Sequence, residues 1–561
     1  MSSSAFRSVL LLAAVLVAAC APHAPIAVPD PDPTYDLLIR NGRVIDGTGS
    51  PWSYADIAIR GDRIVRLGRI PAAEARDTID ASGLVVTPGF IDMLGHSERR
   101  LLRDGRAISK ITQGITSEIT GEVSSVVPVV PLENDEEAEN VLPTWTDLDG
   151  YFEVLEGRGT AINLGTMVTV GTVWSAVIGS VDRRATPEEL AEMARHVDTA
   201  MRDGAMGLSV GLIYAPGSYA STEELASLAR VAARHGGVFR AHIRDEGDGL
   251  LDAVREAIEV GERAGAPVHI HHLKATGPQN WGRVTDAVEL MQAARERGVE
   301  VTADVYPYPA AGTGLQAVLP AWVHEGGREA IVDRLRNPET RARIRDDLVT
   351  GRGGDWWINR AVPGPEAILI ASVSEDTLEH FEGMRLSEVA EARGVEPVDA
   401  LLDLLAEDEA RTSAVYFAMA EEDVRTGLRQ PWVSIGTDGG ARPADHTVEG
   451  SPHPRVYGTF PRVLRKYVRE EGVLTLEDAV RKFTGLAAQQ AGLDERGVLK
   501  AGMYADITVF DAETVADRAT FEDPVQTAIG IEHVIVNGVP VLRDGTPTGE
   551  LPGRGLRGRG R

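Results

Sequence analysis

Short apolar runs alternate with helical patterns through most of the chain. Three of these runs end in a polar side chain, namely Val238–His242, Val268–His272 and Trp432–Asp438. Helical stretches lie between the runs, at Pro187–Asp203, Thr222–His235 and Leu250–Ala264. Thr186, with Glu189 three residues later, is typical of a helix start. Strands that alternate with helices predict a parallel α/β sheet or barrel.

Both ends of the chain have a different pattern, in which short strands are separated by turn residues. Asn41-Gly42 and Gly61-Asp62 interrupt the β-rich segment that follows Asp36, which is typical of hairpins. The same pattern returns at Ala505–Asp511 and His533–Gly538. We therefore predict a TIM-like (β/α)8 barrel (88–485) inserted in a small β-sandwich domain that is formed by both chain ends (36–87 and 486–551).

Two segments depart from these patterns. Residues 309–365 contain the charged helical stretch Arg328–Leu348 and then Gly351–Gly354, which predicts an insertion in the barrel. Such insertions are often lids, and a solvent-exposed excursion without a role is the alternative. The Gly/Arg-rich end, 552–561, is predicted to be disordered.

Charge excludes one class of partner. The chain of 561 residues carries 84 acidic and 57 basic residues, a formal net charge of −27. A nucleic-acid partner would require a basic surface, so none is expected. The length is sufficient to bury a large core.

The only cysteine, Cys20, excludes an intrachain disulfide and follows the apolar stretch Val9–Ala19. That stretch has the length of a secretory signal and is short for a membrane span. Val17–Cys20 resembles a bacterial lipoprotein signal, so we expect a signal peptide (1–20), a lipid on Cys20 and a flexible tether (21–35). Ala21 then favours an outer-membrane lipoprotein that faces the periplasm. The alternative is an ordinary cleaved signal peptide with an incidental cysteine.

The polar residues at the strand ends indicate a chemical site. Catalytic side chains of a barrel project from the C-terminal ends of its strands, which places His242, His272 and Asp438 on one face. Two imidazoles and a carboxylate suggest a metal beside a proton-transfer group. The alternative is that these residues are buried for structural reasons.

Many short motifs are spread between about Asp36 and Leu551. They are Pro88–Asp92, Gln113–Thr116, Gly207–Ser209, Gly211–Tyr214, Ala241–Glu246, His272–Lys274, Asp304–Tyr308, His453–Arg462, Ala505-Asp506 and Val536–Gly538. Together they resemble the D-aminoacylase (N-acyl-D-amino-acid deacylase) branch of the metal-dependent amidohydrolase superfamily. The resemblance implies zinc-dependent hydrolysis of the amide bond of N-acyl-D-amino acids, which releases a carboxylic acid and a D-amino acid.

The resemblance also implies roles for individual residues. His242 and His272 match metal ligands, and Asp438 matches the catalytic acid/base. Arg455 matches a position that binds the substrate carboxylate, for which a guanidinium fork is well suited. The other matched substrate-pocket positions, for which packing is the alternative, are Tyr214, Tyr306 and Met419. Lys274 is either an electrostatic helper in the pocket or a surface residue.

Two departures from the pattern concern the metal. The His-x-His of the superfamily is replaced by Leu94-Gly95-His96, and because leucine cannot bind a metal we expect one tightly bound Zn²⁺ ion. His96 is a weak ligand, a substrate contact or a polar residue of the barrel mouth, and the last two are favoured. The branch's cysteine ligand is absent, which leaves Glu122 as the nearest donor. The alternative places Glu122 outside the ligand set. By strand alternation, His271 faces away from His272 into the core.

Competing functions remain open at this point. One is another amidohydrolase activity, that of a D-dipeptidase or a cyclic amidase. Another is a non-catalytic binding lipoprotein with the same fold, which the missing ligands favour and the presence of Asp438 disfavours. The expected partners are a small-molecule substrate and, through the lipid anchor, a membrane.

Overall fold

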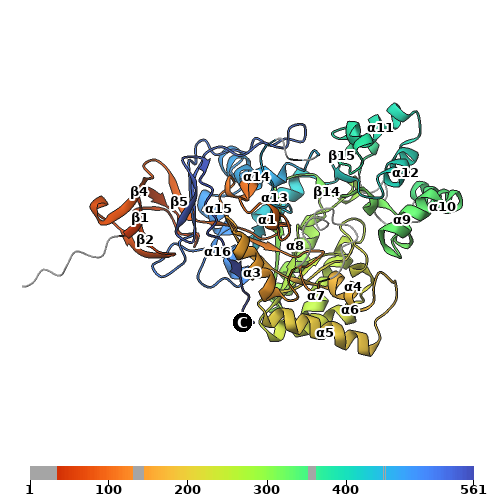
Figure 1. Cartoon of the computed structure of the whole chain (residues 1–561), viewed down its shortest axis with the longest axis horizontal. Coiled ribbons are helices and arrows are strands. Elements are labelled where there is room, and N and C mark those ends of the chain that lie inside the picture. The colour runs from red at the N-terminus through yellow and green to blue at the C-terminus, as the bar shows by residue number, and fades with distance from the viewer. Residues whose placement is uncertain (1–34, 130–143, 351–361, 446–447, 449, 561) are drawn as a thin grey trace, which may run out of the picture.

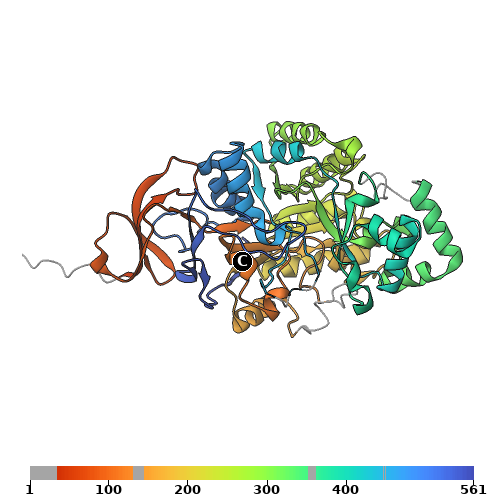
Figure 2. The ribbon, with the colours of Figure 1, turned by 90° about the horizontal axis from the view of Figure 1, so that it is seen from above.

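The structure is a computed structural model that describes residues 35–129, 144–350, 362–445, 448 and 450–560. Cys20, the predicted signal peptide and nearly all of the predicted tether lie outside these residues. A β domain lies at one end of the long axis, a barrel in the middle and an insertion at the other end (Figure 1). Figure 2 shows the same order after a quarter turn. Among the described residues, no helix has the length and apolar character that crossing a bilayer requires.

The β domain is one hydrogen-bonded sheet to which both chain ends contribute. β18 pairs antiparallel with β5, and this pairing joins the two ends. Apolar side chains from both ends, including Ile39, Ile57 and Ile507, meet in one core. The strands are β1 (Tyr35–Val44), β2 (Ser53–Arg60), β3 (Arg63–Gly68), β4 (Ala75–Asp80), β5 (Val85–Pro88), β18 (Ile507–Phe510), β19 (Ile531–Val536), β20 (Val539–Arg543) and β21 (Thr546–Pro547).

The barrel has eight strand positions that are parallel to their neighbours. These are β6 (Phe90–Asp92), β7 (Ile115–Thr120), β8 (Asn163–Thr166) continued by β9 (Val168–Thr169), β10 (Gly207–Gly211), β11 (Val238–His242), β12 (Val268–Ile270), β13 (Val301–Val305) and β17 (Val433–Ile435). The barrel closes between its first and last strands, where Met93 N donates to Ile435 O at 3.1 Å. A barrel inserted in a β domain confirms the predicted fold class.

Helices cover the outside of the barrel. The helical pattern at Pro187–Asp203 is α5, which begins with a capping box between Thr186 and Glu189. α16 packs against β6 and β17, so the barrel continues past the predicted boundary at residue 485. The helices are α1 (Arg100–Arg103), α2 (Ile108–Ile111), α3 (Leu148–Arg158), α4 (Val170–Val177), α5 (Pro187–Arg202), α6 (Thr222–Arg234), α7 (Leu250–Ala264), α8 (Val284–Glu296), α13 (Glu421–Arg429), α14 (Arg455–Arg462), a π-helical turn (Val463–Glu470), α15 (Leu476–Phe483) and α16 (Gly485–Ala491).

The insertion is longer than predicted. After β14 (Ala311–Gly314), the chain forms β15 (Ile368–Ser372) and β16 (Ser413–Tyr416), and β16 pairs antiparallel with both β14 and β15. The predicted end at residue 365 is therefore wrong, because β15 and β16 resemble barrel strands in composition but belong to this separate sheet. Part of the predicted segment, 351–361, lies outside the described residues. The helices of the insertion, which share a core with this sheet, are α9 (Gly327–Arg336), α10 (Pro338–Thr350), α11 (Leu386–Arg393) and α12 (Pro397–Glu407).

The predicted disorder of residues 552–561 is wrong for all of the described part, 552–560. β22 (Gly555–Leu556) pairs parallel with β8, and Leu556 is buried. Gly555 permits this approach, because a Cβ atom there would lie 2.4 Å from Phe152 Cδ1. The arginines form ion pairs with the rest of the molecule, namely Arg554 with Asp62, Arg557 with Asp149 and Arg559 with Asp494. The Gly/Arg-rich composition predicted disorder, but here the glycines allow close packing and the arginines form ion pairs.

Candidate active site

One cavity of about 320 Å³ opens at the C-terminal ends of the barrel strands. It brings together nine of the residues that the sequence analysis singled out: His96, Glu122, Tyr214, His242, His272, Lys274, Tyr306, Asp438 and Arg455. Met419 does not line this cavity. Its Sδ atom lies 4.0 Å from Tyr306 Oη, in a smaller cavity behind the ring.

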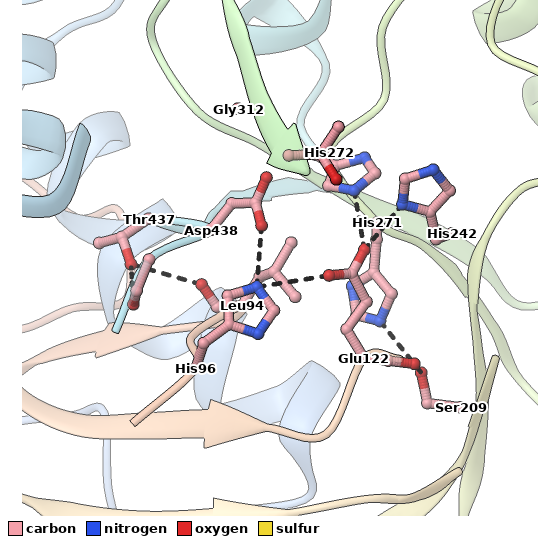
Figure 3. A network of polar contacts seen from close by, with 12 residues as sticks. Leu94, His96, Glu122, Ser209, His242, His271, His272, Gly312, Thr437 and Asp438 are labelled. Atoms are coloured by element: carbon pink, nitrogen blue, oxygen red, sulfur yellow. Dashed lines mark hydrogen bonds and ion pairs between the residues drawn. The ribbon is translucent and has the colours of Figure 1, made fainter. Parts of the chain in front are cut away.

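Glu122 and two imidazoles converge at the centre of the cavity (Figure 3). Oε1 of Glu122 lies 2.9 Å from His242 Nδ1 and 2.9 Å from His272 Nε2. All three side chains are buried. Their donor atoms lie within 4.8 Å of one another, so one ion can contact all three. A carboxylate with two imidazoles is a zinc-type donor set, and the residues therefore fit the metal that the resemblance implies.

The charge states of the donors also favour a cation. Burial raises the pKa of Glu122, but His272 and His242 outweigh it and hold that pKa well below its usual range. Burial is the main cause of the lowered pKa of His242, which favours the neutral imidazole. Burial and Lys274 lower the pKa of His272, but Glu246 and Glu122 raise it to about 10. A metal ion that binds here displaces a proton from His272.

His96 lies on the other side of Glu122 (Figure 3). Its Nε2 atom is 3.0 Å from Asp438 Oδ1 and 3.4 Å from Glu122 Oε2. Burial lowers the pKa of His96, but Asp438 and Glu122 raise it to about 9. Leu94 lies beside this group and is buried, so the first imidazole of a His-x-His pair has no counterpart here.

Asp438 and Arg455 form a pair at the cavity wall. Arg455 Nη1 lies 2.8 Å from Asp438 Oδ2, and Nη2 donates to Gly312 O at 3.1 Å. Within the described residues, the buried Nε atom of Arg455 has no hydrogen-bond acceptor, and Nη1 contacts Asp438 as an ion pair without forming a hydrogen bond. Burial raises the pKa of Asp438, but Arg455 and His96 lower it overall, so this carboxylate is ionised.

A buried brace below Asp438 was not expected from the sequence. Thr437 N donates to Asp92 Oδ1 at 2.8 Å. Lys110 Nζ lies 2.7 Å from Asp92 Oδ2 and donates to Gly439 O at 2.6 Å. Lys110 is fully buried on the short helix α2, between Ile108 and Ile111. A lysine among apolar helix positions was the signal that could have identified it.

The insertion supplies one wall of the cavity. Ala311, Gly312 and Thr313 of β14 line it, and Thr313 Oγ1 lies 3.0 Å from Tyr214 Oη. These three residues were not predicted, since small side chains in an insertion carry no chemical signal. Tyr306 lies between two cations, with Arg455 Cζ at 4.9 Å and Lys274 Nζ at 5.7 Å from its ring centre.

Glu246 is a further cavity residue that was missed. It follows His242 by four positions, inside the motif Ala241–Glu246, and that spacing was the available signal. Its Oε1 atom lies 2.6 Å from Lys274 Nζ and 3.1 Å from His272 Nδ1. Lys274 is therefore a buried cavity residue, not a surface lysine.

A second histidine cluster lies outside this cavity. His271 Nδ1 is 3.3 Å from Asp304 Oδ2, and its Nε2 is 3.4 Å from Ser209 Oγ. His269 is 2.8 Å from the same Asp304 oxygen. All of these side chains are buried and hydrogen-bonded within the barrel. The position of His271 is that of a core residue, and Asp304 also accepts from His272 N at 2.8 Å.

Comparison with known proteins gives a consistent result. Residues 77–542 match the family described as the amidohydrolase family. The chain is 37% identical over 530 residues to a D-aminoacylase of Alcaligenes xylosoxydans xylosoxydans, covering 93% of this chain and 97% of the relative. A crystal structure of N-acyl-D-glutamate deacylase from Bordetella bronchiseptica, complexed with zinc and a phosphonate inhibitor, has a TM-score of 0.80 and 34% identity over 93% of this chain and 100% of that one. A D-aminoacylase structure described by its binuclear metal centre, with one-metal activation and second-metal attenuation, has a TM-score of 0.78 and 35% identity over the same shares.

Proposed function

The chain belongs to the amidohydrolase family, in its D-aminoacylase branch, and from this we propose that it hydrolyses the amide bond of N-acyl-D-amino acids in a zinc-dependent reaction. The products are a carboxylic acid and a D-amino acid. The observation that carries the proposal is the arrangement of one cavity, in which the Glu122, His242 and His272 donors face the Asp438–Arg455 pair.

The reaction requires an activated water, a polarised carbonyl and a proton for the leaving amine. Glu122, His242 and His272 would hold the zinc ion, which when bound would polarise the carbonyl and acidify the water. Asp438 is ionised and can take the proton of the attacking water. The same carboxyl group then returns this proton to the leaving nitrogen, which makes Asp438 the general base and then the general acid.

Arg455 is placed to bind the free carboxylate of the substrate. Its Nε atom lacks an acceptor among the described residues, and a guanidinium offers two parallel donors to a carboxylate. If Arg455 binds the amino-acid carboxylate, it holds the substrate beside Asp438, because the side chains of Arg455 and Asp438 lie 2.8 Å apart. Tyr306 stacks under the guanidinium and limits its motion.

We propose that one zinc ion is bound tightly. Because residue 94 is a leucine and not a histidine, the group formed by His96, Glu122 and Asp438 has only one imidazole. The set formed by Glu122, His242 and His272 keeps three donors that converge on one point. This difference in donors favours a single tight site, in contrast to the binuclear centre named for the related structure.

The test is an assay of purified protein against matched N-acyl-D- and N-acyl-L-amino acids, with and without a chelator. We expect turnover of the D series alone, loss of activity with the chelator and recovery on addition of zinc. Cleavage of D-dipeptides or cyclic amides in place of the D series would favour those activities. Zinc binding without turnover of any substrate would favour a binding protein.

For the location we propose a lipid anchor on Cys20 that holds the enzyme at the outer membrane, facing the periplasm. The apolar stretch before Cys20 and the Pro/Asp-rich segment after it support this. In a bacterial host, the chain without substitutions is expected in the outer-membrane fraction, and Cys20→Ala is expected to abolish membrane attachment. If the chain without substitutions is found wholly in the soluble fraction, the proposed anchor is refuted.

A further inference from the structure

Both candidate histidine ligands lie between two carboxylates. His242 Nδ1 and His272 Nε2 face Glu122, each at 2.9 Å. The other ring nitrogens face Glu246, whose Oε1 lies 3.1 Å from His272 Nδ1 and 3.7 Å from His242 Nε2. Each imidazole therefore turns one nitrogen toward the proposed metal position and the other toward Glu246.

Two buried atoms in this region have unused hydrogen-bonding capacity. Within the described residues, neither His242 Nε2 nor Glu246 Oε2 has a hydrogen-bond partner. The side chain of Glu246 is only 2% exposed, and a buried polar atom without a partner is costly. A proton on His242 Nε2, donated to Glu246 Oε1 after a small closure of the 3.7 Å gap between them, would give this nitrogen a partner. That protonation leaves Nδ1 with the free lone pair that binding a metal requires.

We infer that Glu246 is the positioning carboxylate of the metal centre, which accepts the second ring N–H of both His242 and His272. Histidines that bind metals donate their other N–H to such a carboxylate, and this fixes the tautomer and the ring orientation. One carboxylate here serves two imidazoles. The inference rests on the metal site that is part of the proposed function.

Lys274 completes the arrangement. Its Nζ lies 2.6 Å from Glu246 Oε1 and balances a carboxylate that has almost no access to water. Nζ also lies 2.7 Å from His272 Nδ1. When His272 binds a metal through Nε2, its Nδ1 proton is donated to Glu246, and Lys274 keeps only its bond to the carboxylate.

The competing role for Glu246 is that of a counter-ion which only neutralises Lys274. Removal of both charges together separates the two roles. A counter-ion has no purpose once the lysine is gone, whereas a positioning carboxylate is still required by both histidines.

The experiment compares Glu246→Gln, Lys274→Met and the double variant with the unmodified chain. Glutamine keeps the size but loses the negative charge, so its amide oxygen is a weaker acceptor for the two imidazole N–H groups. Glu256→Gln is the matched control, because Glu256 lies on α7, pairs with Arg244 and does not line the cavity. The readouts are zinc affinity by competition with a chromophoric chelator, the visible spectrum of the cobalt-substituted protein, and the melting temperature without metal.

We expect Glu246→Gln to bind zinc about 10- to 100-fold more weakly and to change the cobalt spectrum. The control should match the unmodified chain, and the double variant should remain weak. Glu246→Gln affinity within twofold of the unmodified chain, or full recovery in the double variant, would overturn the positioning role. Failure of the unmodified chain to bind zinc would instead remove the metal centre and with it the proposed function.

Discussion

The backbone around Asp438 fixes where its carboxylate points. Asp438 has a positive φ of 49°, an uncommon conformation that costs about 1–3 kcal/mol for a residue other than glycine. Its N–H donates to Leu94 O at 2.7 Å, and the preceding Thr437 is bound to Asp92. His272 also has a positive φ, 33°, and its N–H is bound to Asp304. Strain at these two residues, held by buried hydrogen bonds, indicates that their positions serve the site.

Replacement of Asp438 tests the proton transfer. Asparagine is nearly isosteric but cannot carry a proton, so Asp438→Asn should lower kcat roughly 10²- to 10⁴-fold. Zinc content should be unchanged, because Glu122, His242 and His272 keep their donors. Steady-state kinetics and elemental analysis on the same preparation provide the check. Near-normal turnover in this variant would mean that another group carries the proton.

Arg455 is open to a more selective test. Lysine keeps the charge but loses the two parallel donors, so Arg455→Lys should impair recognition of the substrate carboxylate. We expect kcat/KM for an N-acyl-D-amino acid to fall at least tenfold more than for its neutral amide analogue. If Arg455 only braces the insertion through Gly312 O, both substrates would suffer equally and the melting temperature would fall.

At the scale of elements, the sequence predicted the features that follow from local pattern. Each of β11, β12 and β17 is a short, mainly apolar run. A polar residue at the C-terminal end of a barrel strand lies on the face of the barrel that carries the active site. This placed His242, His272 and Asp438 correctly in one cavity. The strands with which a strand pairs are distant in sequence, so the sequence did not show that β15 and β16 belong to a sheet outside the barrel. Glu246 was missed because its role depends on Lys274 and on a second strand.

The C-terminal strand β22 offers a stability test at this scale. Leu556 is 6% exposed, and truncation of a buried leucine costs about 2–5 kcal/mol. Leu556→Ala should therefore lower the melting temperature clearly, while the exposed Arg559–Asp494 pair is worth less than about 1 kcal/mol. Arg559→Ala is the control for the same segment. Equal melting temperatures for Leu556→Ala and the unmodified chain would mean that β22 adds nothing to stability.

At the scale of the whole molecule, the cavity depends on parts that are far apart in the sequence. The barrel provides Glu122, His242 and Asp438, and the insertion at the opposite end from the β domain provides Thr313 (Figure 1). Tyr214 and Thr313 join barrel and insertion by a hydrogen bond at the cavity wall. The side chains that line the cavity therefore come from the barrel and from the sheet of the insertion, and Ala311 of β14 packs with Tyr306 where the two meet.

Metal stoichiometry tests how these donors act together. Glu122, His242 and His272 converge on one point, whereas the group of His96, Glu122 and Asp438 lacks a second imidazole because residue 94 is a leucine. We therefore expect one zinc per chain after extensive dialysis. His242→Ala and His272→Ala should each lose that zinc, as should Glu122→Ala if its carboxylate is a ligand. Leu94→His should restore a second equivalent, because it returns an imidazole beside His96 and Asp438. Elemental analysis and zinc titration of the purified chains would measure this. Two zinc ions retained by the unmodified chain would show that His96, Glu122 and Asp438 form a tight site without the missing imidazole.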